Sequence, residues 1–356
     1  MIAIIGAGPV GNHAAALLAK DGHDVHVFED HAKIGVPIQC TGITTFFLHD
    51  LTKIDDSFLI NTISRTRVYS PNMDFVDIPL KKNFVVDRTK FDGYLADVAQ
   101  SEGAQYHLGH RYDHGTFGKT ITSHFANGKT FASEALVGAD GPRSQVAKSR
   151  GLYGERTFII GHQARVALSC EEDLVEFFLG EGYFGWLVPE SKKVARLGIC
   201  SMRNAKEYFD LLYRKRKGKI LEWQSGIIPL YNPKLQTEKD NVYLIGDAAT
   251  QVKATTLGGI IPGMIAGEVL AQSLNTGKSY QRLWKKSIGR ELYVHLQIHR
   301  MMQRFTDADY NNLIELVKQE RIKHAITEHD REFPSRLMIK LLLREPRFLQ
   351  FAKYIF

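Results

Sequence analysis

The N-terminal segment constrains the fold of this chain more than any other part of the sequence. Residues 2–5 form a short apolar run, and Gly6, Gly8 and Gly11 follow it in the spacing Gly-x-Gly-x-x-Gly, ahead of a helix-type apolar pattern. In such a turn the first glycine allows a sharp bend, the second lets a pyrophosphate approach the backbone, and the third lets the helix pack on the strand. The segment therefore predicts a Rossmann-type dinucleotide site. Val10, at the beginning of a helix whose positive end faces the phosphates, is expected to contact the cofactor.

A carboxylate completes this first unit. Residues 25–28 form a second strand-type run that ends at Glu29, roughly 20 positions after the glycine turn, where an acid can accept hydrogen bonds from ribose hydroxyls. The alternative is a glycine-rich turn followed by an acid that lies there by chance. NAD and FAD share this pattern, so the N-terminal segment alone leaves the cofactor open.

More distant motifs favour FAD. Asp247 ends the buried run 242–245, and Gly259 and Ile260 open a predicted helix over 259–274, which suits a second contact to the ribityl and pyrophosphate part of a long cofactor. Two more segments share this order along the chain, Asp87-Arg88-x-x-Phe91-Asp92 and Gly138-Ala139-Asp140-Gly141-Pro142-Arg143-Ser144. Together these motifs resemble the p-hydroxybenzoate hydroxylase superfamily of FAD flavoproteins. The resemblance implies FAD as cofactor, with Arg88 and Tyr112 among its contacts.

The segment around Cys40 narrows the resemblance. Gly35-Val36-Pro37-Ile38-Gln39-Cys40-Thr41-Gly42-Ile43 resembles the cysteine-containing stretch of the archaeal geranylgeranyl reductase family. The resemblance implies that Cys40 lies beside the flavin ring as the candidate catalytic residue, and that Thr41, Gly42 and Ile43 contact the cofactor. A lone cysteine is otherwise most often a small buried hydrophobic residue.

An aromatic stretch supplies the predicted substrate contacts. Phe184-Gly185-Trp186-Leu187-Val188-Pro189 is similar to the family's Tyr-x-Trp-x-Phe-Pro motif; Trp186 and Pro189 match it, and Phe184 stands in place of the tyrosine. The resemblance implies that Phe184, Trp186 and Pro189 line a slot for an isoprenoid chain, which would bury apolar surface at roughly 25 cal/mol per Å². Ordinary core aromatics are the alternative, and flavin-dependent halogenases have a related motif at this position.

The predicted fold is mixed α/β, with a Rossmann-type FAD-binding domain interleaved with a mixed-sheet substrate domain and followed by a helical C-terminal segment. The expected boundaries are 1–64, 85–150 and 235–276 for the FAD-binding domain, 65–84 and 151–234 for the substrate domain, and 277–356 for the helical region.

Composition limits the classes of function. Three cysteines in 356 residues give no disulfide framework, which indicates a reducing, cytoplasmic location. No apolar run is long enough to span a membrane. The net charge of +7 is compatible with an anionic membrane surface or a phosphorylated substrate, and the basic residues lack the interleaved aromatics that favour nucleic acid. His295 and His299 lack the acid of a His-Glu-x-x-His pattern, so no metal site is expected.

The resemblance implies an FAD-dependent reductase that saturates double bonds of geranylgeranyl lipids or pyrophosphates. Either NAD(P)H or a ferredoxin is the expected electron donor, because no second nucleotide fingerprint is present. Peripheral contact with the inner face of the cell membrane is a further expectation. The alternatives are a monooxygenase or halogenase of the same superfamily and an FAD-containing prenyl-lipid-binding protein without turnover.

Overall fold

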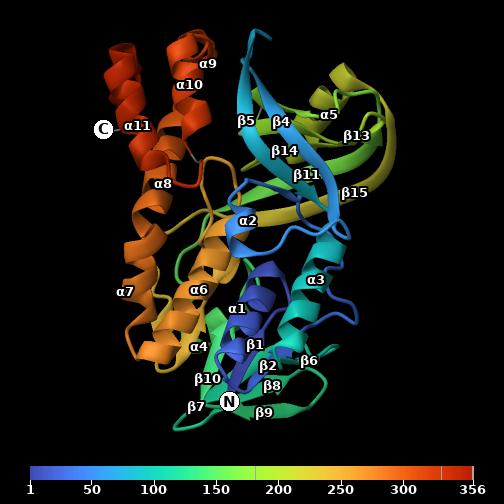
Figure 1. Ribbon diagram of the computed structural model, residues 1–356, viewed down its shortest axis with the longest axis vertical. Helices are drawn as coiled ribbons and strands as arrows, with labels where there is room; N and C mark the ends of the chain where they lie inside the picture. Colours follow the sequence, from blue (N-terminus) through green and yellow to red (C-terminus); the bar gives the residue numbers. More distant parts are fainter. Residues whose placement is uncertain (181, 330, 355–356) are drawn as a thin grey trace. The chain divides into compact units, whose positions relative to one another are not determined.

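The computed structural model describes residues 1–180, 182–329 and 331–354 (Figure 1). The chain divides into two compact units, and each of them is built from three separate stretches. Unit 1 comprises Met1–Ile38, Arg88–Thr157 and Pro229–Tyr293, and unit 2 comprises Gln39–Asp87, Phe158–Ile228 and Val294–Phe356. The prediction of a mixed α/β fold is confirmed. The predicted domain boundaries stay a prediction; the boundaries of the two units differ from them mainly at residues 39–64 and 277–293.

Unit 1 contains a six-stranded sheet in the order β16-β17-β10-β1-β2-β6, whose strands are parallel except for β16. Its strands are β1 (Ile2–Ile5), β2 (Val25–Phe28), β6 (Gln105–His107), β10 (Ala135–Gly138), β16 (Glu238–Lys239) and β17 (Val242–Leu244). Every residue of β1, β2, β10 and β17 is buried, as expected for parallel strands covered on both faces.

Helices and a small antiparallel sheet cover this six-stranded sheet. Helix α1 packs against α3 and α6, while α4 packs against β10 and the three-stranded sheet β7-β8-β9 (Figure 1). The bounds of these elements are α1 (Pro9–Lys20), α3 (Arg88–Ser101), β7 (Tyr112–Phe117), β8 (Ile121–Phe125), β9 (Thr130–Ser133), α4 (Gln145–Arg150), the 3-10 helix η1 (Gly246–Ala249), α6 (Ile260–Thr276), α7 (Tyr280–Trp284) and the π-helical turn η2 (Lys285–Gly289).

Unit 2 contains an eight-stranded mixed sheet in the order β15-β11-β14-β13-β12-β4-β5-β3, in which β12 and β4 run parallel. Its strands are β3 (Ile43–Thr44), β4 (Leu59–Tyr69), β5 (Phe75–Val86), β11 (Phe158–Ala167), β12 (Leu174–Leu179), β13 (Phe184–Ser191), β14 (Val194–Ser201) and β15 (Lys219–Pro229). Helix α5 (Ala205–Arg216) packs on β11 and β14, and its buried Phe209 and Leu212 join Leu187 and Leu197 in one apolar core.

The C-terminal part of unit 2 is helical, as predicted. Its elements are α8 (Arg290–Met302), α9 (Asp307–Val317), α10 (Glu320–Glu328), α11 (Pro334–Arg344) and the 3-10 segment η3 (Pro346–Tyr354). Helix α8 belongs to this unit from Val294 on. The unit also contains the short helix α2 (Leu48–Leu51) near its start. Helices α9 and α10 contact β5, where Val76 and Ile78 pack with Ile314 and Ile322. Among the residues that the structure describes, no helix combines the length and apolar character needed to cross a bilayer.

Candidate functional site

The glycine turn of unit 1 has the geometry that the spacing predicts. Gly6 has a φ of +105°, in the region that favours glycine. A Cβ atom on Gly11 would lie 2.1 Å from the carbonyl oxygen of Gly6, so only glycine lets α1 approach β1 so closely. In contrast, a Cβ on Gly8 would meet no atom within 4 Å. The turn therefore leaves open space at the N-terminus of α1, beside Val10, where the first N–H groups of the helix have no partner within the helix.

The Glu29 carboxylate is fixed against this turn. One oxygen accepts a hydrogen bond from the backbone N–H of Ala7 at 2.9 Å, and the other accepts from the backbone of His31 and pairs with its ring Nδ1 at 2.6 Å. The side chain is only 14% exposed. A carboxylate has about four acceptor positions, so Glu29 can still accept from a ribose hydroxyl while it holds the end of β2 against the turn.

Arg88, at the beginning of α3, is positioned by its own helix. It donates from Nε and Nη2 to the two carboxylate oxygens of Asp92, at 3.0 and 2.9 Å. The fully buried Asn12 connects α3 to the glycine turn, because its amide nitrogen donates to the carbonyl oxygens of Ala7 and Asp92 at 2.9 and 2.8 Å. Asn12 also accepts from the hydroxyl of Tyr106 at 2.9 Å. The side-chain amide of Asn12, on α1, thus holds the glycine turn, α1 and α3 together.

Asp247 lies three residues after the end of β17, as the second residue of η1. Burial raises the pKa of its carboxyl to about 6, and the positive charges of Arg88 and Arg156 oppose this rise. Among the described residues no side chain or backbone group forms a hydrogen bond to this carboxylate. Gly259 immediately precedes Ile260, the first residue of α6, and a Cβ on it would lie 2.6 Å from Oδ1 of Asp247. An unbonded acid beside a helix N-terminus suits a ligand hydroxyl.

A further acid of unit 1 has unused acceptor capacity. Asp140 follows β10, and its Oδ2 accepts from the backbone N–H groups of Gln145 and Val146, at 2.7 and 3.1 Å. Its Oδ1 is buried without a hydrogen-bond partner among the described residues, and burial raises the pKa of this carboxyl. The unpaired carboxylate oxygens and the open turn at Gly8 fit a cofactor with hydroxyl groups and a pyrophosphate, as FAD has.

Tyr112 does not join these residues. Its ring is 4% exposed within the core formed with Ile121 and Phe125, and its hydroxyl forms a 3.0 Å hydrogen bond with Ser149. The packing of this side chain therefore gives no support to the predicted cofactor contact.

The Cys40 stretch begins unit 2. Cys40 is a free, partly buried cysteine, and its Sγ accepts from the backbone N–H of Gly42 at 3.3 Å. The carbonyl of Gly42 accepts from the N–H of Val86 at 2.8 Å, and Ile43 begins strand β3 beside β5. The turn that presents the cysteine is therefore anchored to the edge of the eight-stranded sheet.

A glutamine connects this stretch to the aromatic strand. Oε1 of Gln163 on β11 accepts from the hydroxyl of Thr41 at 2.8 Å and from the indole N–H of Trp186 at 3.2 Å. Its amide nitrogen donates to Gln224 at 2.6 Å. In the sheet, Gln163 pairs with Gly198, which pairs with Trp186, and a Cβ on Gly198 would lie 2.3 Å from the indole. Gly198 thus makes the space in which the indole and the glutamine meet.

Strand alternation separates the three predicted substrate contacts. Phe184 and Trp186 lie on one face of β13, with ring centroids 5.8 Å apart, and they are 9% and 7% exposed. Pro189 pairs with Ala195 and belongs by alternation to the opposite face, which carries Leu187 and packs on α5. The structure brings Phe184 and Trp186 together on the face that contacts Thr41, and it does not bring Pro189 to them.

Comparisons with known proteins identify the family. The profile of the family described as FAD binding domain matches residues 1–219, more than half of the chain. The chain belongs to the FAD binding domain family. The prediction of FAD as cofactor is thereby confirmed. The segment of this chain that matches the family profile contains the glycine turn, Cys40, Arg88 and Trp186, and it ends before Asp247.

Full-length similarity agrees with the narrower resemblance. A digeranylgeranylglycerophospholipid reductase from Methanothrix thermoacetophila is 27% identical over 98% of this chain and 97% of the relative. A crystal structure of a geranylgeranyl bacteriochlorophyll reductase-like protein from Thermoplasma acidophilum superposes with a TM-score of 0.85 at 21% identity, over 100% of this chain and 98% of the other. A flavin-dependent halogenase superposes with a TM-score of 0.72 at 16% identity, over 98% of this chain and 77% of the other. The predicted resemblance to the geranylgeranyl reductases is confirmed, and the fold is shared with halogenases.

This member of the FAD binding domain family contains supporting residues that sequence reasoning missed. Arg156 donates to the carbonyl of Ala248 at 2.7 Å and to that of Tyr153 at 2.9 Å, and so fixes the turn beside Asp247. Gln251 accepts from the N–H of Gly246 at 2.8 Å and donates to the hydroxyl of the fully buried Tyr280 at 2.9 Å. None of these lies in a recognised motif, and a lone polar residue gives no signal of its partners.

Proposed function

We propose that this chain is an FAD-dependent reductase that saturates the isoprenoid double bonds of geranylgeranyl lipids. The observation that supports this most strongly is Gln163, because it hydrogen-bonds both to Thr41, next to Cys40, and to Trp186 on the aromatic strand. The two segments that resemble the reductases therefore meet on one face of the eight-stranded sheet. The name of the relative from Methanothrix thermoacetophila supports the same activity and substrate class.

Most of the residues proposed to hold the cofactor belong to unit 1. The proposed FAD contacts come from the glycine turn and the start of its helix, from the acids that follow β2 and β17, from the first turns of α3 and α6, and from the Cys40 stretch. In the same order they are Gly6, Gly8, Val10 and Gly11; Glu29 and Asp247; Arg88, Gly259 and Ile260; and Cys40, Thr41, Gly42 and Ile43. The open space at Gly8 would admit the pyrophosphate, while Glu29 and Asp247 would accept from cofactor hydroxyls. When bound, reduced FAD supplies a hydride to the substrate double bond.

The side chains of unit 2 would orient the substrate double bond for hydride transfer and exclude water from it. An isolated double bond is a poor hydride acceptor, so orientation against the reactive partner and exclusion of water matter most. Phe184 and Trp186 offer an apolar, buried aromatic face for an isoprenoid chain, and their π faces favour positive charge that develops on the alkene. Cys40 is proposed as the catalytic residue, which shapes the contact with the alkene, gates access to it, or supplies the proton that completes saturation.

Anaerobic reduction tests this proposal. The holoprotein is reduced with dithionite without oxygen, geranylgeranyl lipid is added, and flavin absorbance and product mass are followed. The reductase predicts flavin reoxidation coupled to a gain of two hydrogens per saturated double bond. Reoxidation that occurs only in air, and that an aromatic substrate stimulates, would identify a monooxygenase or halogenase instead. Tight binding of the lipid without any reoxidation would identify a prenyl-lipid-binding protein without turnover.

The electron donor is proposed to be NAD(P)H or a ferredoxin that docks transiently. Offering each donor to the oxidised holoprotein under anaerobic conditions distinguishes them, because only the competent donor bleaches the flavin before lipid is added. A donor that reduces the flavin more slowly than the steady-state turnover rate would be rejected, because no step of the cycle can be slower than the cycle itself.

A peripheral membrane contact is proposed for the C-terminal helices. Ile339, Leu343 and Leu349, on α11 and η3, are 54%, 79% and 58% exposed. Arg336 precedes Ile339, Arg347 lies between Leu343 and Leu349, and both are exposed. Exposed apolar and basic residues together are typical of surfaces that insert at an anionic lipid interface. Co-sedimentation with anionic vesicles is expected to fall for Leu343→Gln and to stay unchanged for Leu211→Gln, an apolar residue that is 46% exposed on α5. Equal binding by both variants would contradict the contact.

A further inference from the structure

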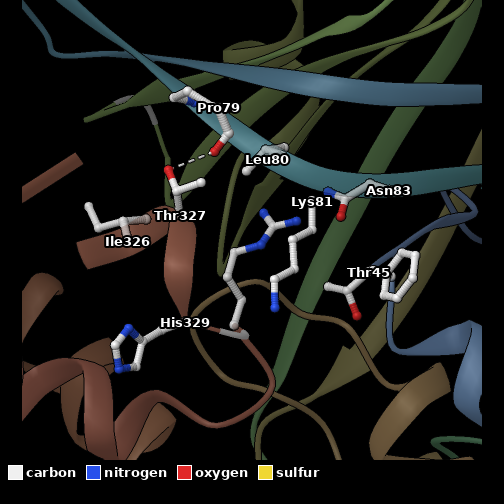
Figure 2. Close-up of a pocket in the computed structure, with 10 residues that line it drawn as sticks. Thr45, Pro79, Leu80, Lys81, Asn83, Ile326, Thr327 and His329 are labelled. Atoms are coloured by element: carbon white, nitrogen blue, oxygen red, sulfur yellow. Dashed lines mark hydrogen bonds between the residues drawn. The ribbon is translucent and has the colours of Figure 1, made fainter. Parts of the chain in front are cut away.

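Unit 2 contains a pocket that the proposed chemistry does not use. It lies between strand β5 and the end of α10, with about 360 Å³ of space, part of it open to solvent. Figure 2 shows Lys81 and Asn83 reaching it from the β5 side, Thr45 from the segment after β3, and Thr327 and His329 from the α10 side. The side chain of Lys81 runs into the space between Thr45 and His329 (Figure 2).

An unpaired amide faces this pocket. Asn83 is 3% exposed, and its side-chain nitrogen Nδ2 is buried without a hydrogen-bond partner among the described residues. A buried amide donor without a partner costs roughly 1–3 kcal/mol. The hydroxyls of Thr45 and Thr327 are already used, since they donate to Glu332 at 2.9 Å and to the carbonyl of Pro79 at 3.1 Å. The wall of the pocket therefore contains a buried amide donor that has no acceptor among the described residues.

The basic residues around the pocket favour a negatively charged acceptor. Lys81 and Arg331 line it together with His329, and no described lining residue is acidic. Glu332 accepts the hydroxyl of Thr45, and Glu328, at the end of α10, pairs with Lys340 of α11. The pairing between β4 and β5 shifts register at residues 80–82 of β5. Such bulges change the direction in which side chains point.

We propose that this pocket binds the phosphate of a phosphate ester, the polar head of the prenyl lipid whose reduction is proposed above. This inference rests on the proposed function for the identity of the ester. Phosphate oxygens would accept from Nδ2 of Asn83 and from the Lys81 ammonium, and they would be neutralised by Lys81 and Arg331. The apolar side chains among the lining residues, Phe46, Leu80 and Ile326, would contact the first carbons beyond the ester.

Adjacent lysines provide a matched test. Lys81 lines the pocket, whereas Lys82 is exposed beside it and is not a lining residue. Isothermal titration calorimetry of the holoprotein would compare geranylgeranyl diphosphate, geranylgeraniol and inorganic phosphate on the wild type, Lys81→Gln, Lys81→Arg and Lys82→Gln. Lys81→Gln is expected to weaken geranylgeranyl diphosphate binding about tenfold. Lys81→Arg should restore most of the affinity, and Lys82→Gln, with the same loss of charge, should stay close to the wild type.

The remaining outcomes separate the two proposals. Affinity for geranylgeraniol should not change in Lys81→Gln; an equal loss for the alcohol and the diphosphate would overturn the phosphate site. Inorganic phosphate bound as tightly as the diphosphate would assign the pocket to a free anion and overturn the head-group assignment. Calorimetry needs no turnover, so absence of double-bond reduction would contradict the reductase while leaving the phosphate site supported by its own binding data.

Discussion

Asp247 is expected to destabilise the protein when FAD is absent. Burial raises the pKa of this carboxyl to about 6, compared with 3.8 in an unperturbed aspartate. Below about pH 3 the acid is protonated in both folded and unfolded chains and has no effect. As the pH rises to 6, the unfolded chain releases the proton more readily, so stability is lost across this interval and stays low above it. The difference corresponds to roughly 3 kcal/mol at neutral pH.

Replacing this acid with its isosteric amide tests the reasoning. Asp247→Asn apoprotein is expected to be more stable than the wild type by up to about 3 kcal/mol at pH 7.5, and by almost nothing at about pH 3. Urea unfolding at a series of pH values, followed by far-UV circular dichroism, measures the difference. Asp97→Asn, an exposed acid on α3 of the same unit, provides a control that should match the wild type at every pH.

The holoprotein should respond in the opposite direction. If Asp247 accepts a cofactor hydroxyl, Asp247→Asn should bind FAD about tenfold more weakly, as expected when a hydrogen bond to a charged group is lost. A variant apoprotein that is less stable than the wild type at pH 7.5 would show that the carboxylate is not strained in the folded state. Unchanged FAD affinity in a stabilised apoprotein would refute the proposed cofactor contact.

Three further substitutions separate the roles of the two units. Gly11→Val should abolish FAD binding, measured as the ratio of flavin to protein absorbance, because its Cβ would lie 2.1 Å from a backbone oxygen, whereas Gly93→Ala, with no atom within 4 Å, should retain FAD. Cys40→Ala should keep FAD and lose most of the reductase turnover; loss of FAD would reassign the cysteine to a structural role. Gln163→Leu should lower the free energy of unfolding by about 2–6 kcal/mol, since it leaves the buried Trp186 N–H and Gln224 amide without partners, and a loss below 1 kcal/mol would refute the network.

Local sequence patterns predicted much of unit 1. The run at residues 2–5 became β1, and the predicted helix over 259–274 became part of α6. These predictions rest on short-range physics, because a buried parallel strand must be apolar throughout and a tight turn into a helix requires glycine. The three-stranded sheet β7-β8-β9 was not predicted, since its strands are short and alternate only weakly.

The contacts inside the candidate site could not be read from the sequence. Gln163 meets Thr41 and Trp186 only because the register of β11, β14 and β13 aligns Gln163 with Gly198 and Trp186. Register between distant strands depends on the whole sheet, so no local pattern announces it. The same alternation explains Pro189, which matched the family motif by type but points by its position toward the α5 face.

The shared fold makes side chains, rather than architecture, decide between reductase and halogenase chemistry. A halogenase superposes on 98% of this chain, so neither the sheets nor the glycine turn distinguish the two activities. The distinguishing features must lie among the groups that face the substrate. On the face of the eight-stranded sheet that is proposed to bind substrate, Phe184 and Trp186 form an apolar pair. Among the described polar side chains of this face, Gln163 hydrogen-bonds with Thr41, Trp186 and Gln224, and the buried Arg196 donates to Glu190 and to the carbonyls of Thr41 and Val86. A face whose polar groups are already satisfied is suited to bind hydrocarbon and exclude water, which is what saturation of an isoprenoid double bond requires.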